Sequence, residues 1–328
     1  MQEFRTKLPA LSYDFKFDHG DEIVCVGSCF AENIAHRLQS NKFKCLLNPF
    51  GILYNPLSIE KVLNLLLDSN SFSEDQLFNH QGLWHSFDHH GHFSKPDKAE
   101  TLQSINSSLA NGQTFLKNTT RLIVTLGTAY VFVYKKSGAI VANCHKLPGN
   151  EFDRKRLDVE TIVEKLSHAF EKIKAKNPEL QIVTTVSPIR HIRDGLVENQ
   201  KSKGVLLLAL GQITTNLDFV HYFPSYEILL DDLRDYRFYE TDMIHPNKLA
   251  IDYIWDYFRL SFFENDTINI IAEIEKFVNA SNHLPFHPDT VQHQTFLKQQ
   301  LEGINRLEEK FSFLDFSREI NLFKNQLL

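Results

Sequence analysis

The sequence contains little cysteine. Its 328 residues include four, at Cys25, Cys29, Cys45 and Cys144. They are too few for the disulfide framework of a small secreted domain, and their spacing matches no paired metal-ligand motif. We therefore expect reduced thiols, no bound metal and no cofactor.

The sequence also lacks an excess of basic residues and any long apolar run. The formal net charge is −6 at pH 7, and Lys and Arg alternate with Asp and Glu instead of forming a basic stripe. No segment approaches the ~20 apolar residues of a membrane span, and the N-terminal stretch has no signal-peptide core. We expect a cytoplasmic protein with no nucleic-acid or membrane partner.

What the chain does contain is a regular alternation of strand-like and helix-like segments. Apolar runs of strand length are followed by stretches with apolar residues at helical spacing. The expected strands cover 23–26, 44–47, 121–126, 180–186 and part of 221–230, and the expected helices 30–38, 57–67, 157–174 and 205–220. A hairpin is expected at 130–142. This alternation predicts a three-layer α/β domain with a mainly parallel sheet.

The stretch Asp21–Leu38 is the centre of this pattern. A buried strand ends at Gly27, which permits a sharp bend, and a helix with apolar residues at helical spacing follows. Ser28 and Cys29 therefore lie near a helix N-terminus, where free N–H groups and the helix dipole favour a thiolate, an alkoxide or an anion. A nucleophile fits this position, and so does an ordinary helix cap followed by a small packing residue.

Asp242 and His245 stand three residues apart, just before a further predicted helix. A histidine whose ring N–H is held by a carboxylate has the tautomer and basicity of a general base for Ser or Cys. Ligands in parallel α/β sheets bind at the carboxyl ends of the strands, where the predicted turns at Gly27, Gly127 and Ser187 all fall. The sequence thus points to chemistry at this edge.

A histidine-rich loop and one further histidine each have a structural and a functional interpretation. The loop Trp84–Ser94 holds four histidines, but no carboxylate or cysteine stands at metal-ligand spacing, so we favour a partly exposed binding or packing loop over a metal site. His145, after the predicted hairpin, is either a ligand for an anionic group or a hydrogen-bonded structural histidine.

The motif Gly27-Ser28-Cys29-Phe30-Ala31 after an apolar strand, with Asp242-x-x-His245-Pro246 near the end of the α/β region, resembles the GSCFA family. That family is similar to the SGNH (GDSL-type) hydrolases, and the resemblance covers about residues 10 to 260. It implies a three-layer α/β/α sandwich of the SGNH-hydrolase type.

The resemblance also implies roles for particular residues. Cys29 stands where the SGNH pattern has its serine nucleophile, with Ser28 at the preceding aspartate position. His245 corresponds to the base and Asp242 to its orienting carboxylate. Gly51 matches the glycine whose N–H helps to form the oxyanion hole, beside the N–H of Cys29.

The third SGNH block departs from the pattern. It corresponds to the segment that begins at Gly127, which lacks the asparagine donor. Thr128, or Asn143 from the hairpin, are the candidate replacements, and His145 is a candidate for binding substrate. Because loss of one oxyanion donor commonly costs ~10²–10³ in rate, this departure weighs against efficient ester hydrolysis.

These observations predict an acyl hydrolase or acyltransferase with a Cys/Ser-His-Asp centre. The family resemblance implies that its substrates are an acyl donor and a carbohydrate or other small hydroxylated molecule. The alternative is a non-catalytic SGNH-like protein that binds a small molecule or serves as a scaffold. If the protein is an enzyme, Ser28 is the alternative nucleophile to Cys29.

The pattern changes near the end of the α/β region. We expect an SGNH-like domain over residues 1–262 and a helical C-terminal extension over 263–328. The apolar positions of the extension fit packing on the α/β domain or self-association.

Overall fold

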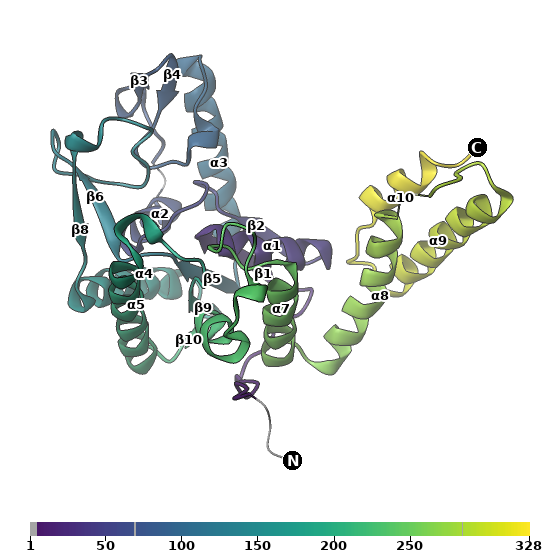
Figure 1. Cartoon of the computed structure of the whole chain (residues 1–328). Coiled ribbons are helices and arrows are strands. Elements are labelled where there is room, and N and C mark those ends of the chain that lie inside the picture. Colours follow the sequence, from purple (N-terminus) through teal and green to yellow (C-terminus); the bar gives the residue numbers. More distant parts are fainter. Residues whose placement is uncertain (1–4, 69, 284) are drawn as a thin grey trace.

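The computed structural model of the protein describes residues 5–68, 70–283 and 285–328, so the predicted first domain is described from Arg5 onward (Figure 1). The central sheet contains five parallel strands: β1 (Glu22–Gly27), β2 (Lys44–Leu47), β5 (Arg121–Leu126), β9 (Gln181–Val186) and β10 (Val220–Tyr222). Their order is β10-β9-β5-β1-β2. This arrangement confirms the predicted α/β class and the mainly parallel sheet.

Helices cover both faces of this sheet. One layer contains α1 (Cys29–Ser40) and α7 (Lys248–Phe262), and the other contains α2 (Pro56–Leu67), α4 (Val159–Lys176) and α5 (Leu196–Asn216) (Figure 1). Successive side chains of β1 point to opposite faces, so Ile23 and Cys25 join the core under α1 and α7 while Val24 and Val26 join the other core. Burial on both faces explains why the strand is a continuous apolar run.

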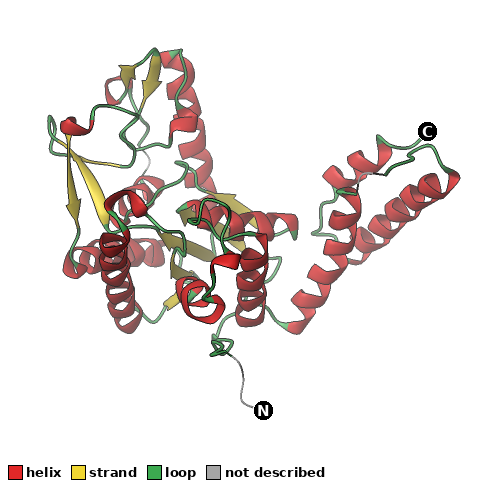
Figure 2. Ribbon diagram, viewed as in Figure 1, coloured by secondary structure: helices red, strands yellow, loops and turns green. Residues whose placement is uncertain are grey.

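Two insertions extend the α/β unit. The first contains the hairpin of β3 (Phe78–His80) and β4 (Leu83–His85) and then α3 (Lys98–Leu116). The second is a small antiparallel sheet of order β7-β6-β8, made by β6 (Tyr130–Tyr134), β7 (Ile140–Val141) and β8 (Phe152–Arg156), which Figure 2 shows apart from the central sheet. The predicted hairpin is β6–β7. The strand β8 was not predicted, because Phe-Asp-Arg-Lys-Arg has no apolar alternation.

The prediction for 205–230 was wrong in its boundaries. The helix α5 begins nine residues before Val205, and β10 is confined to Val220–Tyr222. After Pro224 the chain forms α6 (Ser225–Glu227) and a π-helical turn (Ile228–Leu233) instead of a longer strand. The start of α5 was missed because polar side chains occupy its buried side, as described below.

Three helices complete the chain: α8 (Asn265–Ser281), α9 (Val291–Lys310) and α10 (Ser317–Lys324), which stand to one side of the α/β unit (Figure 1). They share a core of their own that includes Ile274, Leu297, Ile304, Phe316 and Phe323. A nearly buried ion pair between Lys42 Nζ and Glu319 Oε2 (2.6 Å) attaches α10 to the α/β unit. The predicted domain boundary falls between α7 and α8 and stays a prediction.

None of the helices in the described ranges combines the length and the apolar character that crossing a bilayer requires.

Candidate active site

The candidate site lies at the point where the strand order reverses. From β1 the chain runs outward to β2 and then crosses to β5 on the other side of β1. The loops after β1 and β5 therefore diverge and leave a crevice, the usual ligand position in an open parallel sheet. The registers Gly27↔Thr125 and Leu126↔Val186 place the carboxyl ends of β1, β5 and β9 along one edge.

The turn between β1 and α1 presents Cys29 at this edge. Gly27 has φ +135°, and a Cβ there would lie 2.1 Å from the carbonyl oxygen of Thr125, so only glycine fits. Ser28 is the N-cap of α1 and is fully buried, and its hydroxyl accepts the N–H of Phe30 (3.3 Å). Cys29 is half-buried and begins the helix. The hydroxyl of Ser28 thus caps the helix, whereas the thiol of Cys29 lies within reach of His245.

Cys29, His245 and Asp242 form one chain of contacts. Cys29 Sγ lies 4.0 Å from His245 Nε2, at the long end of a hydrogen bond to sulfur. His245 Nδ1 lies 2.6 Å from Asp242 Oδ2. The carboxylate accepts a hydrogen bond from Nδ1–H. In the neutral ring the lone pair is therefore at Nε2, on the side of the thiol. The structure thus brings together the three residues that the two sequence motifs predict.

The Asp242 carboxylate is held in the ionised form. Its Oδ1 accepts the backbone N–H groups of His245 (3.0 Å) and Ile244 (2.8 Å). The backbone N–H of His245, then its side chain, and then the N–H of Ile244 lower the pKa of Asp242 to about 2. The loop is fixed further by the N–H of Glu240, which donates to the carbonyl of His245 (2.8 Å).

The thiol of Cys29 is a poor nucleophile without help. Burial, and then the carboxylate of Glu32 one turn along α1, raise the pKa of Cys29 above its ordinary value. The N–H groups of Cys29 and Phe30 and the ammonium of Lys203 act in the opposite direction. A thiol that is mostly protonated at neutral pH needs a general base to react, and His245 is placed to be that base.

Lys203 lies beneath the site, and the sequence analysis missed it. It is 1% exposed, and its Nζ donates to the carbonyl oxygens of Gly127 (2.7 Å) and Ser187 (2.7 Å), the residues that follow β5 and β9. Burial lowers the pKa of Lys203 to about 7. The helical spacing of the buried stripe Asn199, Lys203, Leu206, Leu210 and Ile213 places this lysine in the core and is the signal that would have found it.

Tyr54 joins the loop after β2 to the end of β5. Its carbonyl oxygen accepts the N–H groups of Gly127 (2.8 Å) and Thr128 (3.0 Å). Burial, and then the charges of Cys29 and Glu32, raise the pKa of the Tyr54 phenol. No local motif marks Tyr54, because its contacts are with residues that follow β5, a distant segment of the sequence.

Two predicted oxyanion donors are engaged elsewhere, which corrects their assignment. The N–H of Gly51 donates to the carbonyl of Asn48 (2.7 Å), and a Cβ on Gly51 would lie 2.3 Å from His90, so this residue backs onto the histidine loop. The hydroxyl of Thr128 pairs with that of Ser202 (3.0 Å) and accepts the N–H of Tyr130 (3.1 Å).

Asn143 and His145 also make contacts away from Cys29. Asn143 Oδ1 accepts the N–H of His145 (2.9 Å). His145 Nε2 lies 2.7 Å from the carbonyl oxygen of Ser86, and burial lowers the pKa of His145 to about 4. These contacts are those of the structural histidine that the sequence analysis held as the alternative.

The histidine loop is packed on aromatic rings. His89 stacks on Phe50 with ring centroids 4.4 Å apart, and His85 Nδ1 lies 2.7 Å from the hydroxyl of Ser94. Across the described ranges, no group of three or more His, Cys, Asp or Glu side chains is placed to hold a metal ion. The contacts of His89 and His85 are those of packed side chains.

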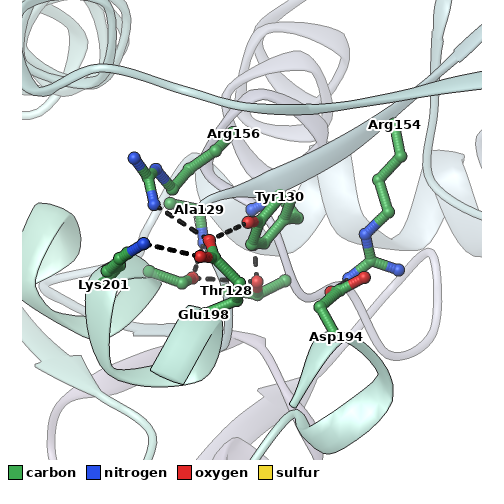
Figure 3. Close-up of polar contacts among 9 residues, drawn as sticks. Thr128, Ala129, Tyr130, Arg154, Arg156, Asp194, Glu198 and Lys201 are labelled. Carbon is green, nitrogen blue, oxygen red and sulfur yellow. Dashed lines mark hydrogen bonds and ion pairs between the residues drawn. The ribbon is translucent and has the colours of Figure 1, made fainter. Parts of the chain in front are cut away.

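A polar cluster fixes the start of α5 against the small antiparallel sheet (Figure 3). Glu198 accepts hydrogen bonds from Tyr130 Oη (2.7 Å), Lys201 Nζ (2.7 Å) and Arg156 Nη1 (3.2 Å). In the same view Arg154 pairs with Asp194 on the turn before α5. The cluster restrains the segment that follows β9 at the edge of the site.

Comparison with known proteins agrees with the sequence motifs. A family model described as the GSCFA family matches residues 22–258, and a second, described as the C-terminal domain of GSCFA domain proteins, matches residues 274–328. Among curated proteins, none matches this sequence.

Two solved structures are similar over much of their length. One is a protein from Streptococcus pneumonia provisionally named a platelet activating factor, with 9% identity, a TM-score of 0.39, and coverage of 73% of this chain and 82% of that one. The other is an acetyl xylan esterase (Est2A) from the rumen bacterium Butyrivibrio proteoclasticus, with 12% identity, a TM-score of 0.35, and coverage of 77% and 65%.

Proposed function

The chain belongs to the GSCFA family, and we propose that it is an acyl hydrolase or acyltransferase that carries its acyl group on Cys29. The observation that carries this proposal is the chain of contacts from Cys29 Sγ through His245 to Asp242, with distances of 4.0 and 2.6 Å. A nucleophile, a base and an orienting carboxylate in this order are the elements of acyl transfer.

The reaction has two halves. His245 Nε2 takes the proton of the Cys29 thiol while the sulfur attacks the carbonyl carbon of an ester. The tetrahedral intermediate collapses, the C–O bond breaks, and His245 gives the proton to the departing alcohol, which leaves a thioester. Water or an acceptor hydroxyl then attacks the thioester with His245 as base, and the thiol is restored as the acid or new ester leaves.

Each remaining group has a defined task in these steps. Asp242 stays ionised, keeps the proton at Nδ1 and stabilises the imidazolium that forms when His245 is protonated. The backbone N–H of Cys29, at the start of α1, is one donor for the oxyanion. We take the acceptor to be water, a carbohydrate or another small hydroxylated molecule, the class that the family resemblance implies.

Intact-mass spectrometry after exposure to activated acyl esters tests this proposal. We expect one acyl adduct on the wild type and on Ser28→Ala. Any adduct on Cys29→Ala or His245→Ala is expected to form more slowly than on the wild type. Cys45 and Cys144 are partly exposed, and the Cys29→Ala variant measures their unassisted reaction. An adduct that forms equally well without His245 would contradict the mechanism.

The other candidate is a binding or scaffolding protein without turnover. It is favoured by the engagement of Gly51 and Thr128, which removes two predicted oxyanion donors. A small molecule that binds stoichiometrically and is recovered unchanged would support it. Multiple turnovers that depend on Cys29 would exclude it.

A further inference from the structure

The site as described has one oxyanion donor and requires another. The N–H of Gly51 is taken by Asn48, and those of Gly127 and Thr128 are taken by Tyr54. The N–H of Cys29 remains at the start of α1. Oxyanion holes are generally built from two or more preorganised donors, so a second group must come from a neighbouring element.

His191 lies beside Gly127, the residue that follows β5. It follows β9 at the same edge of the sheet, and its Nε2 would be 2.9 Å from a Cβ placed on Gly127. Its ring meets the ring of Tyr54 edge-on, with centroids 5.3 Å apart. The carbonyl oxygen of Tyr54 in turn accepts the N–H groups of Gly127 and Thr128, so the imidazole stands beside the loops that follow β2 and β5.

The Nε2 atom of His191 is buried and has no hydrogen-bond partner in the described structure. A buried polar atom without a partner is uncommon in folded proteins and calls for an explanation. A donor that is satisfied only when an oxyanion forms beside it provides one, because such a group stabilises the transition state more than the ground state.

The ring is neutral throughout the working pH range. Burial, and then the charges of Lys203, Arg154 and His245, lower the pKa of His191 to about 3. A neutral imidazole carries one N–H, and with the proton at Nε2 it donates without competing with His245 for the proton of the thiol.

The backbone around His191 is held in place. Its N–H donates to Asn199 Oδ1 (2.9 Å). The segment that follows is tied to the antiparallel sheet by the Arg154–Asp194 pair and by the contacts of Glu198 (Figure 3). A preorganised donor needs this kind of support, since it must not reorganise when charge develops.

We propose that His191 donates its Nε2–H to the oxyanion of the tetrahedral intermediate on Cys29, in place of the asparagine that the third SGNH block would supply. This role rests on the proposed acyl-transfer function. It makes His191 a catalytic residue that contacts the reacting carbonyl oxygen, while His245 handles the proton.

The test compares two reactions of the same thiol. Acylation by p-nitrophenyl acetate passes through an oxyanion, whereas alkylation by iodoacetamide does not, and both need the thiolate. We expect His191→Met to lower the acylation rate by ~10²–10³ while alkylation stays near the wild-type rate. His191→Gln, of similar size but with an amide N–H, is expected to retain a larger part of acylation.

His89→Met is the matched control, because His89 is also buried with an unpartnered Nε2. It should leave the ratio of acylation to alkylation unchanged. Loss of both rates together in His191→Met and His191→Gln, or an unchanged ratio in both, would overturn the donor role. If the wild type shows no His245-dependent acylation, it is the proposed function that fails, and this outcome is separate from the comparison of His191 variants.

Discussion

His89 and His191 are nearly the same by simple measures and differ in their surroundings. Burial is the first cause that lowers the pKa of each to about 3, and each has an unpartnered Nε2. His89 stacks on Phe50, and its Nδ1 lies 2.9 Å from the hydroxyl of Ser86. His191 instead stands beside Gly127 at the ends of the central strands. Burial and neutrality therefore do not distinguish these two histidines, whereas their neighbours do.

The largest effect expected from this contrast is at His245, which is half-exposed and bound to a carboxylate. His245→Gln should lower His245-dependent acylation of Cys29 by ~10²–10⁴, the usual contribution of a positioned general base. The matched change His89→Gln should leave the acylation rate unchanged. Stopped-flow release of p-nitrophenol measures both, and equal losses in the two variants would erase the distinction between the two histidine environments.

The sequence predicted the positions of Cys29, Asp242 and His245 because each lies in a local motif or directly after a buried strand. The strands at 44–47 and 121–126 were also correct to the residue. Burial on both faces gives the second of them its continuous apolar run. By contrast, nothing local shows which carbonyl receives the N–H of Gly51. Hydrogen-bond partners from distant segments decide that question.

Lys203 and His191 were missed for a related reason. Lys203 lies on the buried side of α5 together with Asn199 and Ser202. These polar residues interrupt the apolar pattern that reveals a helix, so the predicted helix began too late. His191 has no motif of its own, and its environment is made by Tyr54 and Gly127 from other loops. When the surroundings of a residue come from three separate segments, no single segment contains a sequence pattern that identifies it.

The next effect in size concerns stability at Lys203. Its pKa is about 7 in the folded chain, against an ordinary value of 10.5, so the unfolded chain binds more protons between these values. The free energy of unfolding contributed by this group therefore rises with pH from about 7 to 10.5. Lys203→Met leaves the carbonyls of Gly127 and Ser187 without this donor, at about 1–3 kcal/mol each.

Urea denaturation at pH 6 and pH 9 measures this effect. The loss caused by Lys203→Met should be larger at pH 9, because at pH 6 the wild type also bears the cost of a buried charge. Lys201→Met, which removes an exposed lysine two residues away, should change the free energy of unfolding by no more than about 0.5 kcal/mol at either pH. A pH-independent loss at Lys203 would mean that its ammonium is not penalised by burial.

The smallest effect is expected at Glu32, the residue that separates the contribution of charge from that of burial at the nucleophile. Burial comes first and the Glu32 carboxylate second among the causes that raise the pKa of Cys29, so Glu32→Gln should lower this pKa. Alkylation by iodoacetamide at pH 8 should then rise about two- to fivefold. Glu164→Gln, an exposed change on α4, should leave the rate unchanged.

Because a more acidic thiol depends less on its base, the loss of alkylation rate caused by His245→Gln should be smaller when Glu32→Gln is also present. An undiminished loss would show that His245 does more than deprotonate Cys29.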